Sequence, residues 1–112
     1  MGTVLHRTLV ILKNKEFVLV PDNAYVENER VGFIQPDAIH GVPDMVVEVW
    51  IPSLSNYERL MVNKMEIYAN CGVREYWIVD PFDRFIRKYA LSSGAYREVQ
   101  ESDLFPNLRL SL

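Results

Sequence analysis

The stretch "GVPDMVVEVW", residues 41–50, predicts the central strand of the fold and places two acids on it. Successive side chains of a strand point to opposite faces. One face of this strand is wholly apolar and consists of Met45, Val47, Val49 and Ile51. The other face carries Asp44 and Glu48 together with Val46 and Trp50. Acids on the face of a buried strand indicate either charge partners or a functional site.

The residues after this strand predict a helix and then a second apolar strand. Ser55 and Glu58 form a capping-box pattern, and Gly72 stands where a helix C-cap is expected. Apolar residues recur between them at helical spacing, at Tyr57, Leu60, Met61, Met65 and Tyr68. The segment "REYWIVDP", residues 74–81, is then almost wholly apolar. Strand, helix and strand predict a parallel pair with a crossover, hence a mixed α/β (α+β) domain with one principal helix on a central β-sheet.

Hairpins are predicted on both sides of this unit. Residues 3–12 and 16–26 are rich in apolar and β-branched side chains and predict two strands, with Pro21 indicating an edge or a bulge. Residues 27–41 predict a loop. Residues 83–91 and 95–100 predict a second hairpin across "SSG", and residues 103–112 predict a weak final strand.

Size and composition favour one globular domain. The chain has 112 residues, of which 49% are hydrophobic and 24% charged, with a net charge of −3. This balance argues against disorder and against a generally basic nucleic-acid coat protein, but it leaves room for DNA binding through a local basic cluster. A single cysteine and no recognisable signal peptide predict a cytoplasmic protein.

Lys64 is unusual for its place in the predicted helix. At about 100° per residue it lies between Leu60 and Tyr68, in the middle of the apolar stripe. Its stem is then buried and its ammonium points towards the sheet, where a carboxylate would be its simplest partner. The alternative is that Lys64 extends outwards to water at the edge of the helix.

The two acids of the central strand cannot form one site by themselves. Four residues along a strand span roughly 13 Å, so Asp44 and Glu48 are too far apart to bind one ion. Glu48 needs an acid from elsewhere, and Asp22, which follows Pro21, is the best candidate. Mg²⁺ is held by one or two carboxylates, and such a pair beside a lysine suits phosphodiester hydrolysis. The alternative is structural: Asp44 begins the strand, and Glu48 pairs with Lys64.

Several segments resemble a known family. They are "VPDNAYV" (20–26), "GVPDMVVEVWIPS" (41–53), Lys64 with Tyr68 in the helix, and "CGVREYWIVDP" (71–81). From about residue 16 to the C-terminus the chain resembles the Uma-two family of the PD-(D/E)XK restriction-endonuclease-like superfamily. The resemblance implies a metal-dependent DNA endonuclease that uses Mg²⁺ or Mn²⁺.

The resemblance also implies roles for individual residues. Asp22 corresponds to the first metal-binding aspartate, and Glu48 corresponds to the glutamate of the (D/E)XK element. Trp50 stands where the lysine of that element is expected, and Lys64 on the helix is expected to substitute for it. Asp44 matches the acid at the start of the strand and is expected to have a supporting role.

One departure from the family keeps a second function open. Family members are usually longer at the N-terminus, so residues 1–112 are expected to form a single, N-terminally shortened domain. The alternative to an active nuclease is therefore a catalytically inactive, nuclease-like remnant that acts as an oligomerising or DNA- or protein-binding module. Exposed sheet edges also favour a homo-oligomer, with a dimer as the first expectation.

The basic residues Arg84, Arg87 and Lys88 in the second hairpin are the local candidates for contacts with DNA phosphates. Clusters of this kind more often form a solvated face.

Overall fold

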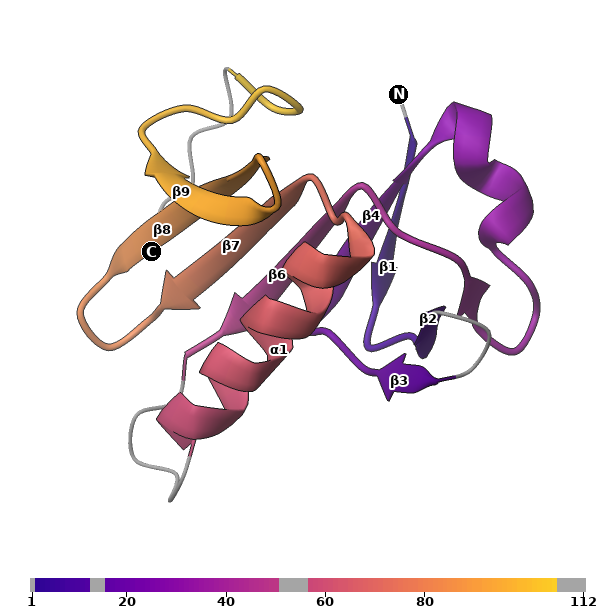
Figure 1. The fold of residues 1–112 in the computed structure, drawn as a ribbon, viewed down its shortest axis with the longest axis horizontal. Helices are drawn as coiled ribbons and strands as arrows, with labels where there is room; N and C mark the ends of the chain where they lie inside the picture. Colours follow the sequence, from indigo (N-terminus) through magenta and orange to yellow (C-terminus); the bar gives the residue numbers. More distant parts are fainter. Residues whose placement is uncertain (1, 13–15, 51–56, 107–112) are drawn as a thin grey trace.

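The computed structural model describes residues 2–12, 16–50 and 57–106, with the side chains of residues 57–61 left aside. Within these residues the main sheet has six strands, in the spatial order β1 (Gly2–His6), β4 (Asn23–Glu27), β6 (Met45–Val49), β7 (Glu75–Asp80), β8 (Phe85–Ser92) and β9 (Ala95–Val99). A three-stranded sheet consists of β3 (Phe17–Leu19), β2 (Val10–Leu12) and β5 (Ile39–His40). The helix α1 (Tyr57–Cys71) lies against one face of the main sheet (Figure 1). The architecture is thus the mixed α+β fold with one principal helix that the sequence predicts.

The strand–helix–strand unit is confirmed. β6 and β7 pair in parallel, with Val46 opposite Tyr76 and Glu48 opposite Ile78, and α1 connects them. Gly72 follows the helix with a φ of 89°, and the Val73 N–H donates to the Tyr68 carbonyl oxygen at 3.0 Å. This is the glycine-terminated helix end that satisfies the last carbonyl groups. The predicted N-cap, Ser55, lies outside the described residues.

The two long strands predicted near the N-terminus are each broken in two, which corrects the prediction. Arg7 has a φ of 43°, a left-handed conformation that ends β1 before β2 begins. Pro21 interrupts the second segment between β3 and β4. The breaks lie side by side, because the Arg7 N–H donates to the Asp22 carbonyl oxygen at 3.1 Å. The hairpin therefore bends there, with β1 pairing β4 in the main sheet and β2 pairing β3 in the small one.

Of the remaining predicted segments, the second hairpin is confirmed, and the loop and the final strand differ from the prediction. The loop predicted over 27–41 contains the 3₁₀ helix η1 (Asn28–Phe33) and the two-residue strand β5. The second hairpin is confirmed, because β8 and β9 pair around Ser93 and Gly94, whose positive φ values suit a two-residue turn. Residues 103–106 of the predicted final strand form no strand, and 107–112 lie outside the described part.

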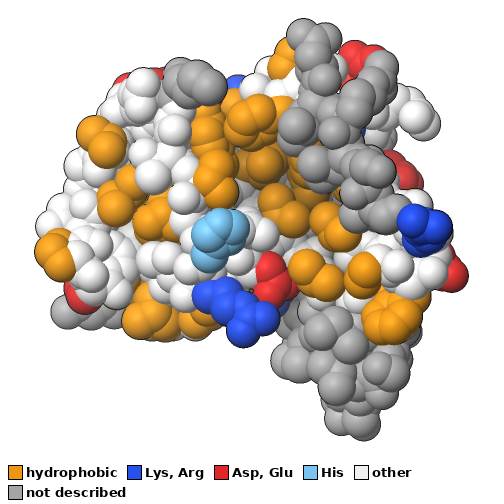
Figure 2. All heavy atoms as spheres, turned by 180° about the vertical axis from the view of Figure 1, so that it is seen from behind, with side chains coloured by type: hydrophobic (Ala, Val, Ile, Leu, Met, Phe, Trp, Pro, Cys, Tyr) orange, Lys and Arg blue, Asp and Glu red, His pale blue; other side chains and the backbone are white. Residues whose placement is uncertain are grey.

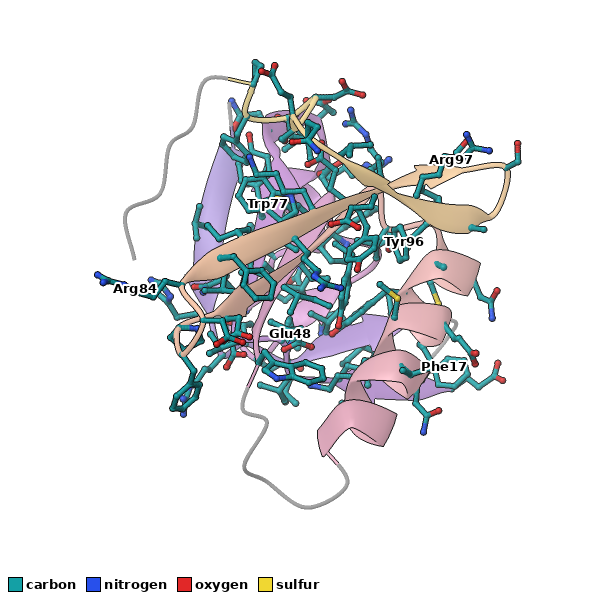
Figure 3. All side chains as sticks on the ribbon, turned by 90° about the vertical axis from the view of Figure 1, so that its left-hand side faces the viewer. Phe17, Glu48, Trp77, Arg84, Tyr96 and Arg97 are labelled. Atoms are coloured by element: carbon teal, nitrogen blue, oxygen red, sulfur yellow. The ribbon has the colours of Figure 1, made fainter. Side chains whose placement is uncertain are left out.

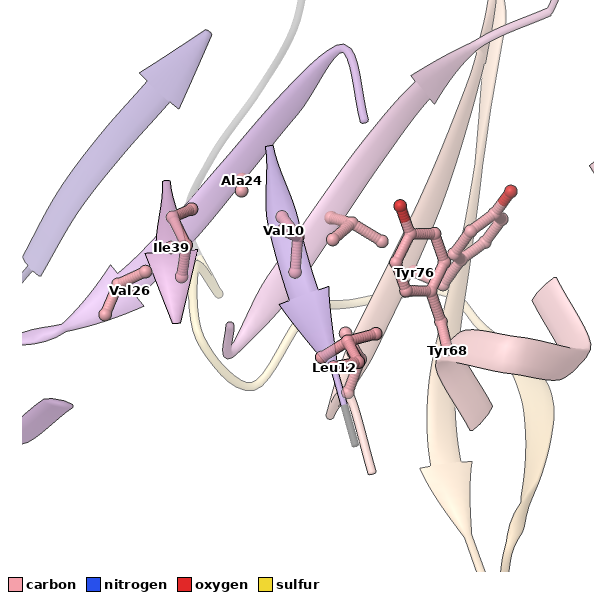
Figure 4. Packing of buried hydrophobic residues seen from close by; sticks show 9 residues of the cluster. Val10, Leu12, Ala24, Val26, Ile39, Tyr68 and Tyr76 are labelled. Carbon is pink, nitrogen blue, oxygen red and sulfur yellow. The ribbon is translucent and has the colours of Figure 1, made fainter. Parts of the chain in front are cut away.

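The larger hydrophobic cluster lies between the main sheet, α1 and the small sheet. Its buried members come from all three and are Val10, Leu12, Ala24, Val26, Ile39, Val46, Tyr68, Val73 and Tyr76 (Figure 4). Because Val46 belongs to this cluster, the face of β6 that carries Asp44 and Glu48 is the face covered by α1. The two acids therefore lie on the interior side of the sheet.

The opposite face of the main sheet carries a smaller cluster. Tyr25, Met45 and Trp77 form it, and Leu104 and Phe105 from the segment after β9 pack against it. Figure 2 shows hydrophobic side chains gathered over the centre of this face.

Glu75 explains how the segment after β9 is held. Its buried carboxylate accepts hydrogen bonds from the Ser102 hydroxyl at 2.6 Å and from the Leu104 N–H at 3.0 Å. It also accepts one from the Trp77 indole at 2.9 Å. A buried acid with these partners has a structural role.

Among the described residues, no helix has both the length and the apolar character needed to cross a membrane.

Candidate functional site

Asp22 and Glu48 lie next to each other on the α1 side of the sheet. β4 and β6 pair with Asn23 opposite Val47, so the same antiparallel register places Asp22 opposite Glu48. Each acid also binds the backbone of the other strand. The Val49 N–H donates to Asp22 Oδ2 at 2.7 Å, and the Asp22 N–H donates to Glu48 Oε1 at 3.3 Å. These bonds hold both carboxylates at one place.

Lys64 reaches this pair from the helix. Its Nζ lies 3.1 Å from Glu48 Oε2 and donates to the Val20 carbonyl oxygen at 3.5 Å. The Lys64 side chain remains 28% exposed, so it is only partly buried, whereas Glu48 is almost wholly buried. Figure 3 shows Glu48 on the side of the sheet that faces α1. The inward-facing lysine that the helical spacing predicts is therefore present, and it does not extend away from the sheet.

Burial dominates the electrostatics of Glu48. Its side chain is only 2% exposed, and this burial raises the pKa of the carboxyl group above its usual range. The Lys64 ammonium and the Asp22 N–H act in the opposite direction, but the net shift is upwards. The site therefore holds a carboxylate whose charged form is disfavoured chiefly by burial.

Asp44 is held at the other end of β6 by different partners. It accepts a hydrogen bond from the Glu27 N–H at 2.7 Å, and its Oδ1 lies 3.5 Å from Arg30 and 3.7 Å from Arg74. Asp44 does not approach Glu48, and this agrees with the strand spacing, which predicts that the two acids are too far apart to share a site. Its supporting role in the site stays a prediction.

The basic residues of the second hairpin do not form one cluster. Arg87 is paired with Ile78, which is opposite Glu48, so Arg87 lies on the same face of the sheet as the two acids. Lys88 points to the other face, where its ammonium lies 5.0 Å from the centroid of the Trp77 ring. Arg84 lies in the turn between β7 and β8 (Figure 3). Their contact with DNA stays a prediction, for which Arg87 is now the best placed.

The chemistry of the donors fits a hard divalent cation. Asp22 and Glu48 present carboxylate oxygens side by side on the same face of the sheet. The described residues contain no group of three or more histidine, cysteine, aspartate or glutamate side chains placed to bind a metal ion. Two carboxylates are enough for Mg²⁺, which keeps several waters in its coordination shell, and they are not a typical zinc site.

The family model of Uma2, described as "putative restriction endonuclease", matches residues 1–112. The chain belongs to the Uma2 family. The match also includes the first 15 residues, which precede the segments that carry the sequence resemblance. No protein of curated function matches the sequence.

A solved structure shares the fold. It is a putative nuclease belonging to DUF820 from Anabaena variabilis, with a TM-score of 0.72 and 16% sequence identity. The alignment covers 98% of this chain and 65% of the other, so the chain spans less than two-thirds of that protein's length. This match shows that the Uma2 chain shares the fold of that protein.

Two features of the Uma2 site escape prediction from sequence. Arg30 and Arg74 meet at Asp44 although they are far apart in the chain, and no local spacing indicates this. The second feature is a place in the site for Tyr68, which the sequence puts in the apolar stripe and in the family resemblance without a role; it is buried one helical turn after Lys64. Its spacing of four residues from Lys64 is the signal that could have drawn attention to it.

Proposed function

We propose that this Uma2 chain is a metal-dependent endonuclease that hydrolyses phosphodiester bonds in DNA. The observation that carries the proposal is the convergence of Asp22, Glu48 and Lys64 from three separate segments onto one face of the sheet. Structural ion pairs do not need a second carboxylate beside the first. An adjacent acid raises the electrostatic cost of the site, as expected where a cation is to be bound.

Each residue of the site has a part in this proposal. Asp22 and Glu48 hold Mg²⁺ or Mn²⁺, and their bonds to the backbone of the neighbouring strand keep both carboxylates in place. When bound, the cation supplies positive charge that activates water and neutralises charge on the phosphate. Lys64 then turns from Glu48 and orients the attacking water or stabilises the phosphate in the transition state.

Membership of the Uma2 family supports a nucleic-acid substrate. Arg87, which lies on the same face as Glu48, is two strands away, roughly 10 Å across the sheet. At that distance it contacts a phosphate next to the one that is cleaved, and Arg84 at the turn contacts one farther along the strand.

Cleavage of a supercoiled plasmid with Mn²⁺ or Mg²⁺ tests the proposal. Wild-type protein is expected to nick the plasmid, and EDTA to stop it. Glu48→Gln and Lys64→Met are each expected to reduce the rate by about 100-fold or more, because each removes a group that acts on the reacting atoms. Glu66→Gln is the matched control, since Glu66 is an exposed acid of α1 outside the site.

The outcome separates the proposal from its alternative. Folded wild-type protein that leaves the plasmid intact with either cation would contradict the nuclease and favour the inactive module. Activity that survives in Glu48→Gln would instead indicate a contaminating nuclease or a site elsewhere.

A further inference from the structure

The Tyr68 hydroxyl is a buried polar group that the proposed mechanism leaves without a task. Tyr68 is 0% exposed, and its hydroxyl has no hydrogen-bond partner among the residues that the structure describes. A buried hydroxyl without a partner lowers stability, and a phenylalanine would fill the same space without that loss. Such a group in a native protein needs an explanation.

Its position connects it with the two acids. Tyr68 follows Lys64 by four residues, so both side chains leave the same face of α1. Lys64 contacts Glu48 directly, and the charges of both Glu48 and Asp22 act on the Tyr68 hydroxyl, whose pKa is raised first by burial and then by Glu48. Figure 4 shows the rings of Tyr68 and Tyr76 side by side, with both hydroxyl oxygens at the same end.

We propose that Tyr68 is a positioning residue for Glu48, an inference that rests on the proposed function. Its hydroxyl donates a hydrogen bond to the Glu48 carboxylate when the Lys64 ammonium turns towards the substrate. Glu48 is too buried for water to replace Lys64 freely, and a buried carboxylate that loses its partner is strongly destabilised. Carboxylates that bind metal ions are themselves held by hydrogen bonds, and the Tyr68 hydroxyl is a buried donor without a partner among the described residues, one helical turn from Lys64.

A double-mutant cycle measured by urea denaturation without any cation tests this hydrogen bond. Tyr68→Phe in the wild-type background is expected to leave the midpoint unchanged or to raise it, because the hydroxyl has no partner there. In the Lys64→Met background Glu48 has lost its ammonium, so the same substitution is expected to lower the midpoint. An equal effect of Tyr68→Phe in both backgrounds would overturn the inference.

Tyr96→Phe is the matched control within the same aromatic cluster. The Tyr96 hydroxyl donates to the Val73 carbonyl oxygen at 2.7 Å, and its ring lies 5.7 Å from that of Tyr76. Removing this hydroxyl is expected to lower the midpoint by the same amount in both backgrounds.

Mn²⁺ titration by calorimetry provides a second measurement, which stands even if Lys64→Met does not fold. Tyr68→Phe is expected to weaken Mn²⁺ binding about 10-fold, the usual effect of losing a hydrogen-bond partner of a metal ligand, and Tyr96→Phe to leave it unchanged. If wild-type protein binds Mn²⁺ and Tyr68→Phe binds it equally tightly, this inference is overturned while the proposed function stands. Wild-type protein that binds no Mn²⁺ contradicts the proposed function and the role of Tyr68 within it.

Discussion

Glu48 is the residue at which stability and function have opposite requirements. Its carboxylate is buried next to a second acid, and burial raises its pKa despite the contact with Lys64. A raised pKa means that the folded state favours the protonated form. The charged form, which would bind a cation, is therefore the one that the fold tolerates less well, as is common where a site is built for a ligand.

Glu48→Gln tests this conflict through the pH dependence of stability. The contribution of Glu48 to stability is fully present below its ordinary pKa of 4.5 and is lost as the pH rises through the raised folded value. Glutamine stays neutral throughout. Glu48→Gln should therefore gain stability relative to wild type in urea denaturation as the pH rises above 4.5. A wild type that becomes the more stable of the two over this range would contradict the assignment.

At the scale of the elements, the end of α1 sets the positions of Lys64 and Tyr68. Gly72 ends the helix in the left-handed region, and the Val73 N–H then closes the last turn on the Tyr68 carbonyl. This end leads directly into β7, next to the strand of Glu48. The backbone at Gly72 thus determines how the helix face is aligned with the acids.

Gly72→Ala is expected to lower the free energy of unfolding by about 1 kcal/mol, because alanine in the left-handed region is strained. Nothing lies within 4 Å of an added Cβ there, so no steric clash contributes. Gly32→Ala is the control, since that position is equally open and lacks a positive φ. Urea denaturation should show a loss for Gly72→Ala and none for Gly32→Ala, and equal effects would contradict the role of the helix end.

Elements whose apolar residues recur at a regular spacing could be predicted from the sequence. The point at which the first predicted strand breaks, at Arg7, could not. The alternation in β6 and the spacing of Lys64 in α1 indicate which way Glu48 and Lys64 point, and the structure agrees. The bend of the first hairpin depends on the φ of Arg7 and on which residues it pairs with across the chain. No composition rule marks Arg7 as a break, so one long strand was predicted in place of β1 and β2.

At the scale of the whole molecule, the candidate site exists only because three distant segments meet. Asp22 joins Glu48 through the β4–β6 register, which local sequence does not determine. The sequence predicts the pair only because Glu48 needs a second acid, for which Asp22 is the best candidate and the one that the family resemblance implies. The same long-range packing brings Arg30 and Arg74 to Asp44. The directions of Glu48 and Lys64 are thus predictable from their own elements, whereas the contacts of Arg30 and Arg74 with Asp44 are not.

The central claim is that Asp22 and Glu48 together bind a divalent cation, and Mn²⁺ calorimetry tests it most directly. Wild-type protein is expected to bind Mn²⁺, and Glu48→Ala to abolish that binding while the fold, checked by circular dichroism, is retained. Asp44→Asn is the matched control, because Asp44 is an equally buried acid of the same segment that has other partners. Mn²⁺ binding that is lost in Glu48→Ala and kept in Asp44→Asn is the predicted result. Binding that survives in Glu48→Ala, or that is absent from the wild type, would contradict it.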